Sequence, residues 1–131
     1  MSTELVQLPS FYASPGFLLL ATDDGQPVGC VGLRGVDDTT GEIRRLFVHQ
    51  NAKGKGTGRA LMETLISQAS ATGLRHLILN TVPTMVEAGH LYARLGFEPI
   101  PRYHLTTTPG VLYLGLDLPA ERTRARQATT E

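Results

Sequence analysis

The stretch KGKGTGRAL, from Lys53 to Leu61, joins a strand-like run to a helix-like run and places three glycines at the junction. Glycines let the backbone turn toward a ligand and leave no side chain in its way. The N-terminus of the helix that follows carries unpaired N–H groups and a partial positive charge. The stretch therefore predicts a backbone cradle for a phosphate or pyrophosphate, with Lys53, Lys55 and Arg59 adding charge at its rim. A surface turn with solvated charges is the alternative.

Three apolar runs of strand length precede this loop and are separated by short turn clusters. The runs are residues 17–22, 27–36 and 42–48, and the turns are DDGQ at 23–26 and DDTTG at 37–41. Short turns between apolar runs are typical of hairpins, so we expect an antiparallel meander.

The apolar spacing changes to a helical period after the loop. It predicts a helix over residues 57–72 that stops at Gly73, followed by a strand over residues 76–81. Phe97 is expected to begin one more strand, and residues 111–118 are expected to form the last strand, so that the two make a final hairpin. Before the meander, residues 4–12 are expected to form a short helix that Pro9 breaks.

A second helix is predicted to follow the strand at residues 76–81. Thr84 and Glu87 have the spacing of a capping box, and Gly96 is a natural stop. The expected buried face of this helix consists of Met85, Ala88, Tyr92 and Leu95. A meander that feeds a strand–helix–strand crossover predicts an α/β (α+β) fold, with a mixed sheet and helices packed on it.

The composition fits one domain and excludes several classes of protein. The chain has 131 residues and a formal net charge of zero, which gives no global electrostatic reason to bind nucleic acid or acidic membranes. No apolar run approaches the roughly 20 residues of a membrane span, and MSTELVQLPSF does not resemble a signal peptide. We therefore expect a cytoplasmic protein with one domain at residues 1–118 and a flexible tail at residues 119–131.

The sequence favours neither a disulfide nor a metal site built from cysteine or histidine side chains. Cys30 is the only cysteine, so no internal disulfide can form, and the four histidines lack metal-ligand spacing. We expect no metal site.

Two common nucleotide motifs do not match the glycine loop. A P-loop needs Gly-Lys-Ser/Thr after a four-residue gap, and this loop lacks it. A dinucleotide fold needs G-x-G-x-x-G directly after a strand, whereas this loop has G-x-G-x-G several residues beyond one. A nucleotide-binding domain of another type stays open.

The loop instead resembles the acetyl-CoA loop of the GCN5-related N-acetyltransferase (GNAT) family. The family motif is Gln/Arg-x-x-Gly-x-Gly/Ala, and KGKGTG matches it except that Lys53 stands at the first position. EIRRLFV and HLILNT resemble the central strands of the family, and AGHLYARLGF at 88–97 resembles its second signature. The resemblance covers about residues 17–118.

The resemblance implies an N-acetyltransferase that moves an acetyl group from acetyl-CoA to a primary amine by direct attack in a ternary complex. It implies a mostly antiparallel twisted sheet with helices on both faces. The family usually has a strand and two helices before the meander, so the N-terminal elements here are expected to be shortened. The acceptor is expected to be a small-molecule or peptide amine. A non-catalytic regulatory module that binds CoA or acyl-CoA is the alternative function.

Two residues match positions that carry catalysis in the family. Glu42 lies fourteen residues before Gly56, the register of a catalytic glutamate in some relatives, and is predicted to act as a base through water. It could instead pair with Arg44 or face solvent. Tyr92 matches a tyrosine near the CoA sulfur in many relatives and is predicted to protonate the leaving thiolate. It could also be a core aromatic residue.

The resemblance also implies a set of acetyl-CoA contacts. In the family the central strand splays from its neighbour and exposes backbone groups that pair with the pantetheine arm. The predicted cofactor-binding residues are Leu46, Phe47, Val48, Lys53, Gly54, Lys55, Gly56, Thr57, Gly58, Arg59, Asn80, Ala88 and Tyr92.

Weaker expectations concern the acceptor and assembly. Arg44 and Arg45 are expected on opposite faces of their strand, where one could favour an acidic acceptor. Tyr103 and His104 are candidates for lining the acceptor side. The last strand, at residues 111–118, offers an edge for a homodimer.

Overall fold

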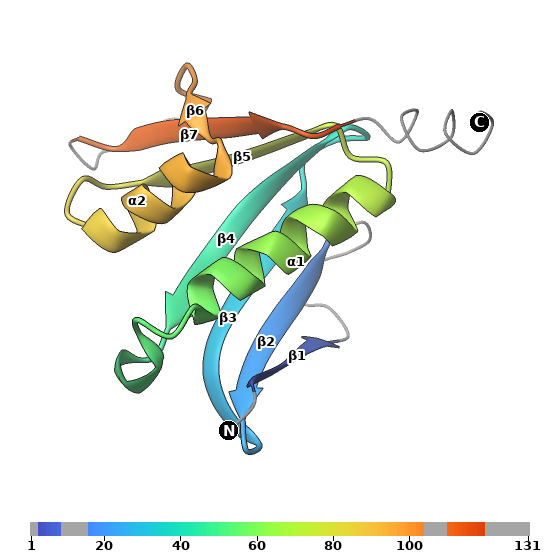
Figure 1. Ribbon diagram of the computed structural model, residues 1–131. Coiled ribbons are helices and arrows are strands. Elements are labelled where there is room, and N and C mark those ends of the chain that lie inside the picture. Colours follow the sequence, from blue (N-terminus) through green and yellow to red (C-terminus); the bar gives the residue numbers. More distant parts are fainter. Residues whose placement is uncertain (1–2, 9–15, 104–109, 120–131) are drawn as a thin grey trace.

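Seven strands form one twisted sheet in the computed structural model, which describes residues 3–8, 16–103 and 110–119 (Figure 1). The strand order is β1-β2-β3-β4-β5-β7-β6. The strands are β1 (Thr3–Leu8), β2 (Phe17–Asp23), β3 (Gln26–Gly35), β4 (Thr40–Val48), β5 (His76–Thr81), β6 (Glu98–Pro99) and β7 (Leu112–Asp117). The helices are η1 (Gln50–Ala52), α1 (Thr57–Ala71) and α2 (Val86–Leu95).

The predicted fold class is confirmed. Strands β2, β3 and β4 form the antiparallel meander, and β4 pairs with β5 in parallel through the crossover that contains α1. Strand β7 pairs antiparallel with β5 and β6, so the sheet is mixed and mostly antiparallel. Gly73 and Gly96 have φ values of 97° and 99°, the left-handed conformation expected after a helix.

The predicted N-terminal helix is wrong over the residues that the structure describes. Residues 3–8 form β1, which pairs antiparallel with β2 along its whole length. The apolar strand β2 would otherwise leave its outer backbone groups unpaired, and this pairing outweighs the local helical pattern. Residues 9–15 of the same prediction lie outside the described part of the chain.

The predicted capping box does not form. Helix α2 begins at Val86, its N-cap is Met85, and no side chain caps it. The amide of Met85 donates to the carbonyl of Val82, so Thr84 lies inside a turn and cannot be the cap. Met85 is 48% exposed and does not belong to the buried face predicted for it.

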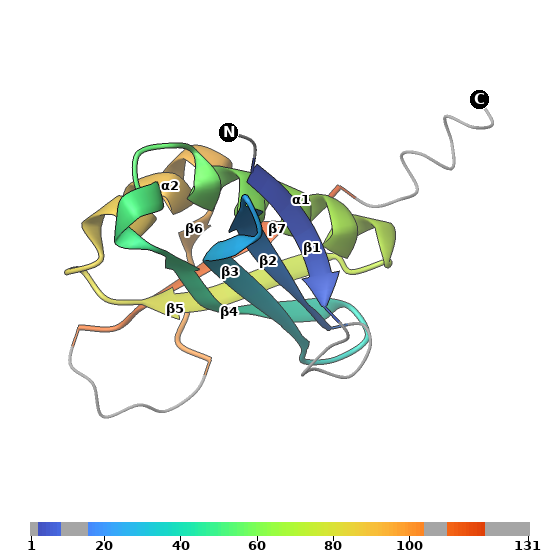
Figure 2. The same ribbon diagram turned by 90° about the horizontal axis from the view of Figure 1, so that it is seen from below.

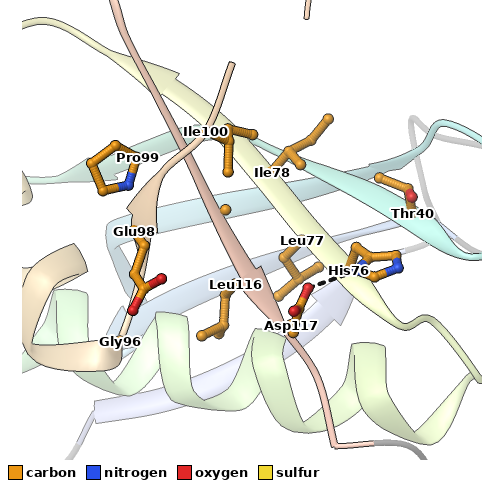
Figure 3. Close-up of a pocket in the computed structure, with 11 residues that line it drawn as sticks. Thr40, His76, Leu77, Ile78, Gly96, Glu98, Pro99, Ile100, Leu116 and Asp117 are labelled. Atoms are coloured by element: carbon orange, nitrogen blue, oxygen red, sulfur yellow. Dashed lines mark hydrogen bonds and ion pairs between the residues drawn. The ribbon is translucent and has the colours of Figure 1, made fainter. Parts of the chain in front are cut away.

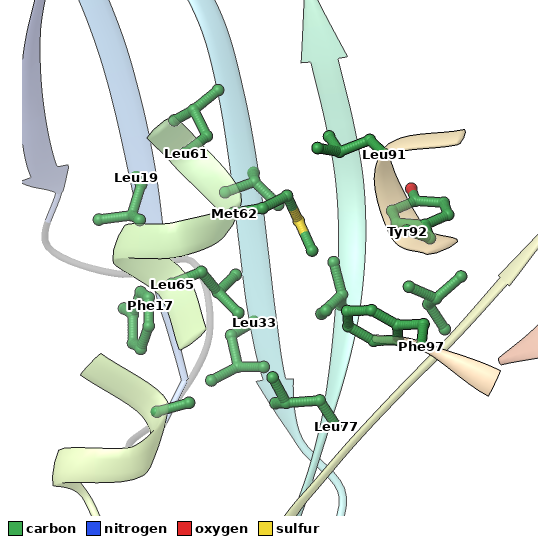
Figure 4. Close-up of a cluster of buried hydrophobic side chains, with 14 of the residues drawn as sticks. Phe17, Leu19, Leu33, Leu61, Met62, Leu65, Leu77, Leu91, Tyr92 and Phe97 are labelled. Carbon is green, nitrogen blue, oxygen red and sulfur yellow. The ribbon is translucent and has the colours of Figure 1, made fainter. Parts of the chain in front are cut away.

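Both α-helices pack on one face of the sheet, so the prediction of helices on both faces is wrong for the described residues (Figure 2). One hydrophobic cluster joins Leu61 and Leu65 of α1 with Leu91 and Tyr92 of α2 over buried strand residues (Figure 4). Among the described residues no helix covers the opposite face, which we call the helix-free face. No helix in this part of the chain is both long and apolar enough for a membrane span.

The last strand is not an edge of the sheet. Strand β7 lies between β5 and β6, although β6 covers it only at Gly115 and Leu114. The outer strands are β1 and β6. The dimer edge that the sequence predicts at residues 111–118 is therefore partly occupied within the chain.

Candidate functional site

Strands β4 and β5 separate partway along their length and leave a V-shaped gap, which we call the split (Figure 1). Their parallel pairing ends at Glu42 opposite Ile78, yet β4 continues to Val48 and β5 to Thr81. Beyond Glu42, the edge of β4 that faces β5 therefore has no β5 partner. The splay that the resemblance implies is present in this chain.

A β-bulge changes the course of β4 inside the split. Arg44 pairs with Gly32 and Phe47 with Cys30, so two residues of β4, Arg45 and Leu46, stand opposite one residue of β3. Arg45 has φ of 61°, a conformation that costs a non-glycine residue about 1–2 kcal/mol. The bulge therefore stores backbone strain at the split.

The bulge and the register together decide which amides face the gap. The amide of His49 donates to the carbonyl of Val28 on β3. Since alternate strand residues present their backbone groups to opposite edges, the amide of Phe47 also faces β3. Leu46 and Val48 then present their backbone groups to the split. Of the three β4 residues among the predicted acetyl-CoA contacts, Leu46, Phe47 and Val48, only Leu46 and Val48 therefore have backbone groups directed into the split.

The glycine loop supplies the second part of the site. Gly54 and Gly56 have φ values of 80° and 81°, in the left-handed region that favours glycine. Gly56 is the N-cap of α1, and no side chain in the described part of the chain caps this end, so the first-turn amides are left for another acceptor. Lys53 and Lys55 are exposed beside them, whereas Arg59 pairs with Glu63 at 2.8 Å.

The loop and the split meet at Gly58. A Cβ added at Gly58 would lie 3.5 Å from Val48 of β4 and 3.5 Å from Leu91 of α2. The first turn of α1 therefore lies directly beside the end of β4 and the middle of α2. Thr57, next in the chain, is buried, so the start of the helix is fixed to the sheet.

Tyr92 lies in the same region and belongs to the hydrophobic core. It is 6% exposed, and its ring lies 5.8 Å from that of Phe97. Its hydroxyl is on the side of the ring away from Phe97 (Figure 4). Burial raises the pKa of Tyr92, so the phenol stays protonated at neutral pH. The core position and the acid role predicted for Tyr92 are compatible.

Ala88 lies one turn before Tyr92 on α2 and packs partly against the core. The next residue, Gly89, has no heavy atom within 4 Å of a Cβ built on it. The helix surface at this position is therefore open.

Glu42 begins the split and is surrounded by donors on the helix-free face. It is 4% exposed, and Arg34 donates from Nε and Nη2 to its Oε1 at 3.2 and 2.7 Å. Arg44 Nη1 lies 3.6 Å from the same oxygen, and the Tyr103 hydroxyl donates to Oε2 at 3.0 Å. These contacts suit an anchor for two guanidinium groups. The base role predicted for Glu42 stays a prediction.

Asn80 extends this polar group across the split. Its amide nitrogen donates to the Tyr103 hydroxyl at 3.2 Å, so its side chain is on the helix-free face. Burial, with the neighbouring Glu42 carboxylate, raises the pKa of Tyr103 to about 12. Tyr103 is therefore a neutral donor at physiological pH. The other acceptor-side candidate, His104, lies outside the described residues.

Sequence reasoning missed Arg34. It lies on β3 directly opposite Glu42 across the hairpin. Counting the antiparallel register outward from the turn at residues 37–41 would have found the pair. The sequence pattern indicated only Arg44, which is closer to Glu42 in sequence than Arg34 is but lies farther from its carboxylate.

A second hollow lies at the other end of β5 (Figure 3). It has a volume of about 510 Å³ and is lined by residues of β5, β6 and β7, with the pair His76–Asp117 at 2.8 Å on its wall. None of the predicted catalytic or cofactor-binding residues lines it. The split and the glycine loop, rather than this hollow, bring the predicted residues together.

The conformation of Gly56 predicts a contrast with Gly58. Gly56→Ala is expected to lower the free energy of unfolding by about 1–2 kcal/mol, because alanine is strained at a φ of 81°. Gly58→Ala is the matched control: its Cβ has ordinary contacts, and alanine favours a helix by up to about 1 kcal/mol. Urea unfolding of both variants measures the difference. Equal effects would contradict the loop conformation described above.

Comparisons with known proteins agree with this geometry. The sequence profile of the acetyltransferase (GNAT) family matches residues 2–97. An uncharacterized N-acetyltransferase of Schizosaccharomyces pombe is 29% identical over 110 residues, which cover 82% of this chain and 68% of that protein. N-acetylaspartate synthetase of Danio rerio is 30% identical over 114 residues, covering 85% of this chain and 40% of that protein.

Solved structures share the fold. A GNAT family acetyltransferase from Elizabethkingia anophelis, with acetyl-CoA bound, superimposes with a TM-score of 0.72 at 20% identity. The match covers 88% of this chain and 98% of that one. The chain thus has the strand split and the glycine loop together with a sequence and a fold that match these acetyltransferases. It belongs to the acetyltransferase (GNAT) family.

Proposed function

We propose that this chain transfers an acetyl group from acetyl-CoA to a primary amine by direct attack in a ternary complex. The observation that carries the proposal is the split in the sheet beside the glycine loop. Among the described residues, the edge of β4 in the split has no β5 partner beyond Glu42 and no side chain caps the first turn of α1. Gly58 lies where these two features meet. A CoA thioester needs both, because it has an extended amide-containing arm and a pyrophosphate.

The residues present fit acetyl-CoA. The left-handed Gly54 and Gly56 let the loop backbone turn without side chains in the way, and the first turn of α1 would hold the pyrophosphate. Leu46 and Val48 would pair with the amides of the pantetheine arm. Lys53 and Lys55 would add charge at the rim, while Arg59 shares its charge with Glu63.

Bound acetyl-CoA supplies the acetyl group and a thiolate leaving group. The transfer forms a nitrogen–carbon bond on the amine and breaks the carbon–sulfur bond, whose electron pair stays on sulfur. Tyr92 is proposed to donate its hydroxyl proton to that sulfur, since burial keeps the phenol protonated. The attacking nitrogen loses its second proton as the amide forms, and that proton returns to the Tyr92 oxygen through water. One of the Leu46 and Val48 amides is proposed to stabilise the negative charge that develops on the thioester oxygen, while the other amide and the carbonyls of both residues pair with the pantetheine arm.

The amine must lose a proton before it attacks, because an alkyl ammonium with a pKa near 10 is not a nucleophile. Glu42 is the proposed base, acting through water. The contacts of Arg34 and Arg44 go to Oε1, whereas Oε2 accepts from the neutral Tyr103 hydroxyl, so Oε2 is the oxygen better suited to take a proton. The ion pairs on Oε1 also make Glu42 an anchor for Arg34 and Arg44. Kinetics of Glu42→Gln separate the base role from this anchoring role.

The test of the proposal is release of free thiol from acetyl-CoA in the presence of primary amines, with the N-acetylated product identified by mass spectrometry. The panel contains alkylamines, amino acids and peptides. We expect thiol release that depends on both the protein and one class of amine. If the protein binds CoA but releases no thiol with any amine, it is the regulatory binding module and the proposal fails.

A further inference from the structure

The helix-free face carries a compact charged group at the start of the split, which we call the arginine cluster: Arg34, Glu42 and Arg44. We propose that this cluster binds a carboxylate of the amine acceptor, so that the acceptor class is a primary amine that also carries a carboxylate group. The inference rests on the proposed acetyl transfer and names the substrate class of the same site.

The cluster has one more positive charge than negative charge. Glu42 has a side chain that is 5% exposed, whereas Arg34 and Arg44 are 47% and 41% exposed. The Glu42 carboxylate is thus buried and engaged in ion pairs within the protein, while the guanidinium groups of Arg34 and Arg44 are still accessible to solvent. An excess of one positive charge suits a monoanion such as a carboxylate better than a dianionic phosphate.

The contacts in the cluster also make it rigid. Arg34 donates two N–H groups to Oε1 of Glu42, so its guanidinium plane is fixed while its other N–H groups point elsewhere. Arg44 is held more loosely, at 3.6 Å from the same oxygen. A guanidinium group has a planar fork that matches a carboxylate, and Arg44 has more of that fork free.

The position of Arg44 connects the cluster to the reacting centre. Ile43 is buried in the helix-side core, so its neighbours Glu42 and Arg44 face the opposite side of the sheet. The pairing with β5 ends at Glu42, so Arg44 lies just inside the split. Leu46, whose backbone faces the gap, is two residues farther along β4. A carboxylate on Arg44 would therefore hold an acceptor at the entrance of the split.

The experiment compares acceptors that differ only at the carboxylate. Thiol release from acetyl-CoA is measured with glycine, β-alanine and 4-aminobutyrate, with the carboxamide of each, and with propylamine. For at least one pair we expect kcat/KM to be about tenfold or more higher for the carboxylate than for the carboxamide. Arg44→Gln is expected to bring that ratio close to one, mainly by raising KM for the carboxylate.

Arg94→Gln is the matched control, because it makes the same change at an exposed position of α2, on the other face of the sheet. It should leave the ratio unchanged. Thermal unfolding confirms that each variant is folded, and Arg34→Gln provides a second test in the same direction if Arg44→Gln does not fold. Equal rates for every carboxylate and its carboxamide would overturn the inference while leaving acetyl transfer intact. A ratio that survives both arginine variants would overturn it as well. No thiol release with any of these amines would overturn the inference, and no release with the alkylamines and peptides of the wider panel as well would overturn the proposed function.

Discussion

Tyr92→Phe is expected to lower kcat by about 10²–10⁴-fold while acetyl-CoA affinity stays essentially unchanged. The variant removes only the hydroxyl group, whose proton is proposed to go to the leaving sulfur. The phenylalanine ring keeps the packing of Tyr92 against Phe97, so the fold should be retained. Steady-state kinetics give kcat, and calorimetric titration gives the acetyl-CoA affinity.

Tyr113→Phe is the matched control, since it removes a phenol hydroxyl from another buried tyrosine of the same domain, on β7. It should change kcat far less than Tyr92→Phe. An unchanged kcat for Tyr92→Phe would show that Tyr92 is only a core residue. A loss of acetyl-CoA affinity equal to the loss of rate would assign its hydroxyl to binding rather than to proton transfer.

Glu42→Gln is expected to lower kcat/KM for the amine by about 100-fold. The buried carboxylate holds Arg34 by two hydrogen bonds and accepts a third from Tyr103, and hydrogen bonds to a charged group contribute about 1.5–3 kcal/mol. Because Glu42 is the proposed base, we expect part of the loss in kcat, and because its Oε1 holds Arg34 and Arg44, we expect the rest as a higher KM for the amine. A loss confined to KM would leave Glu42 the anchoring role alone and contradict the base role.

Glu63→Gln serves as its matched control, because Glu63 is an exposed glutamate that also pairs with an arginine, Arg59. An exposed pair on one helix contributes only about 0.3–0.5 kcal/mol, so this variant should change stability little. If Glu42→Gln leaves both kcat and KM unchanged, Glu42 has neither role.

Most of the fold could be predicted from the sequence because the local signals agree with the tertiary structure. The alternating runs and turn clusters of the meander, and the glycine stops at Gly73 and Gly96, appear in the structure as expected. The failures occur where a longer-range contact decides. Residues 3–8 take a strand conformation because β2 offers a free edge, and Thr84 is held in a turn that closes before α2 begins.

The candidate site was predictable in part for the same reason. The glycine loop is local in sequence, so its position and its left-handed glycines follow from the residues themselves. The arginine cluster depends on strand register and on which face each residue takes, and Arg34 is therefore absent from the predicted site. The face covered by the helices was also not predictable, because helical spacing shows which side of a helix is buried but not which side of the sheet it covers.

Thermal unfolding of the chain with acetyl-CoA, with CoA, and with NAD and ATP as controls tests whether the split and the glycine loop bind a CoA thioester. We expect a rise in Tm with acetyl-CoA and CoA alone, since a ligand at 100 times its Kd adds about 2.7 kcal/mol of stability. We also expect a smaller rise for Gly56→Ala, whose loop is strained. No rise with acetyl-CoA or CoA in a folded sample, or an equal rise with NAD and ATP, would contradict the assignment of the split and the glycine loop to a CoA thioester.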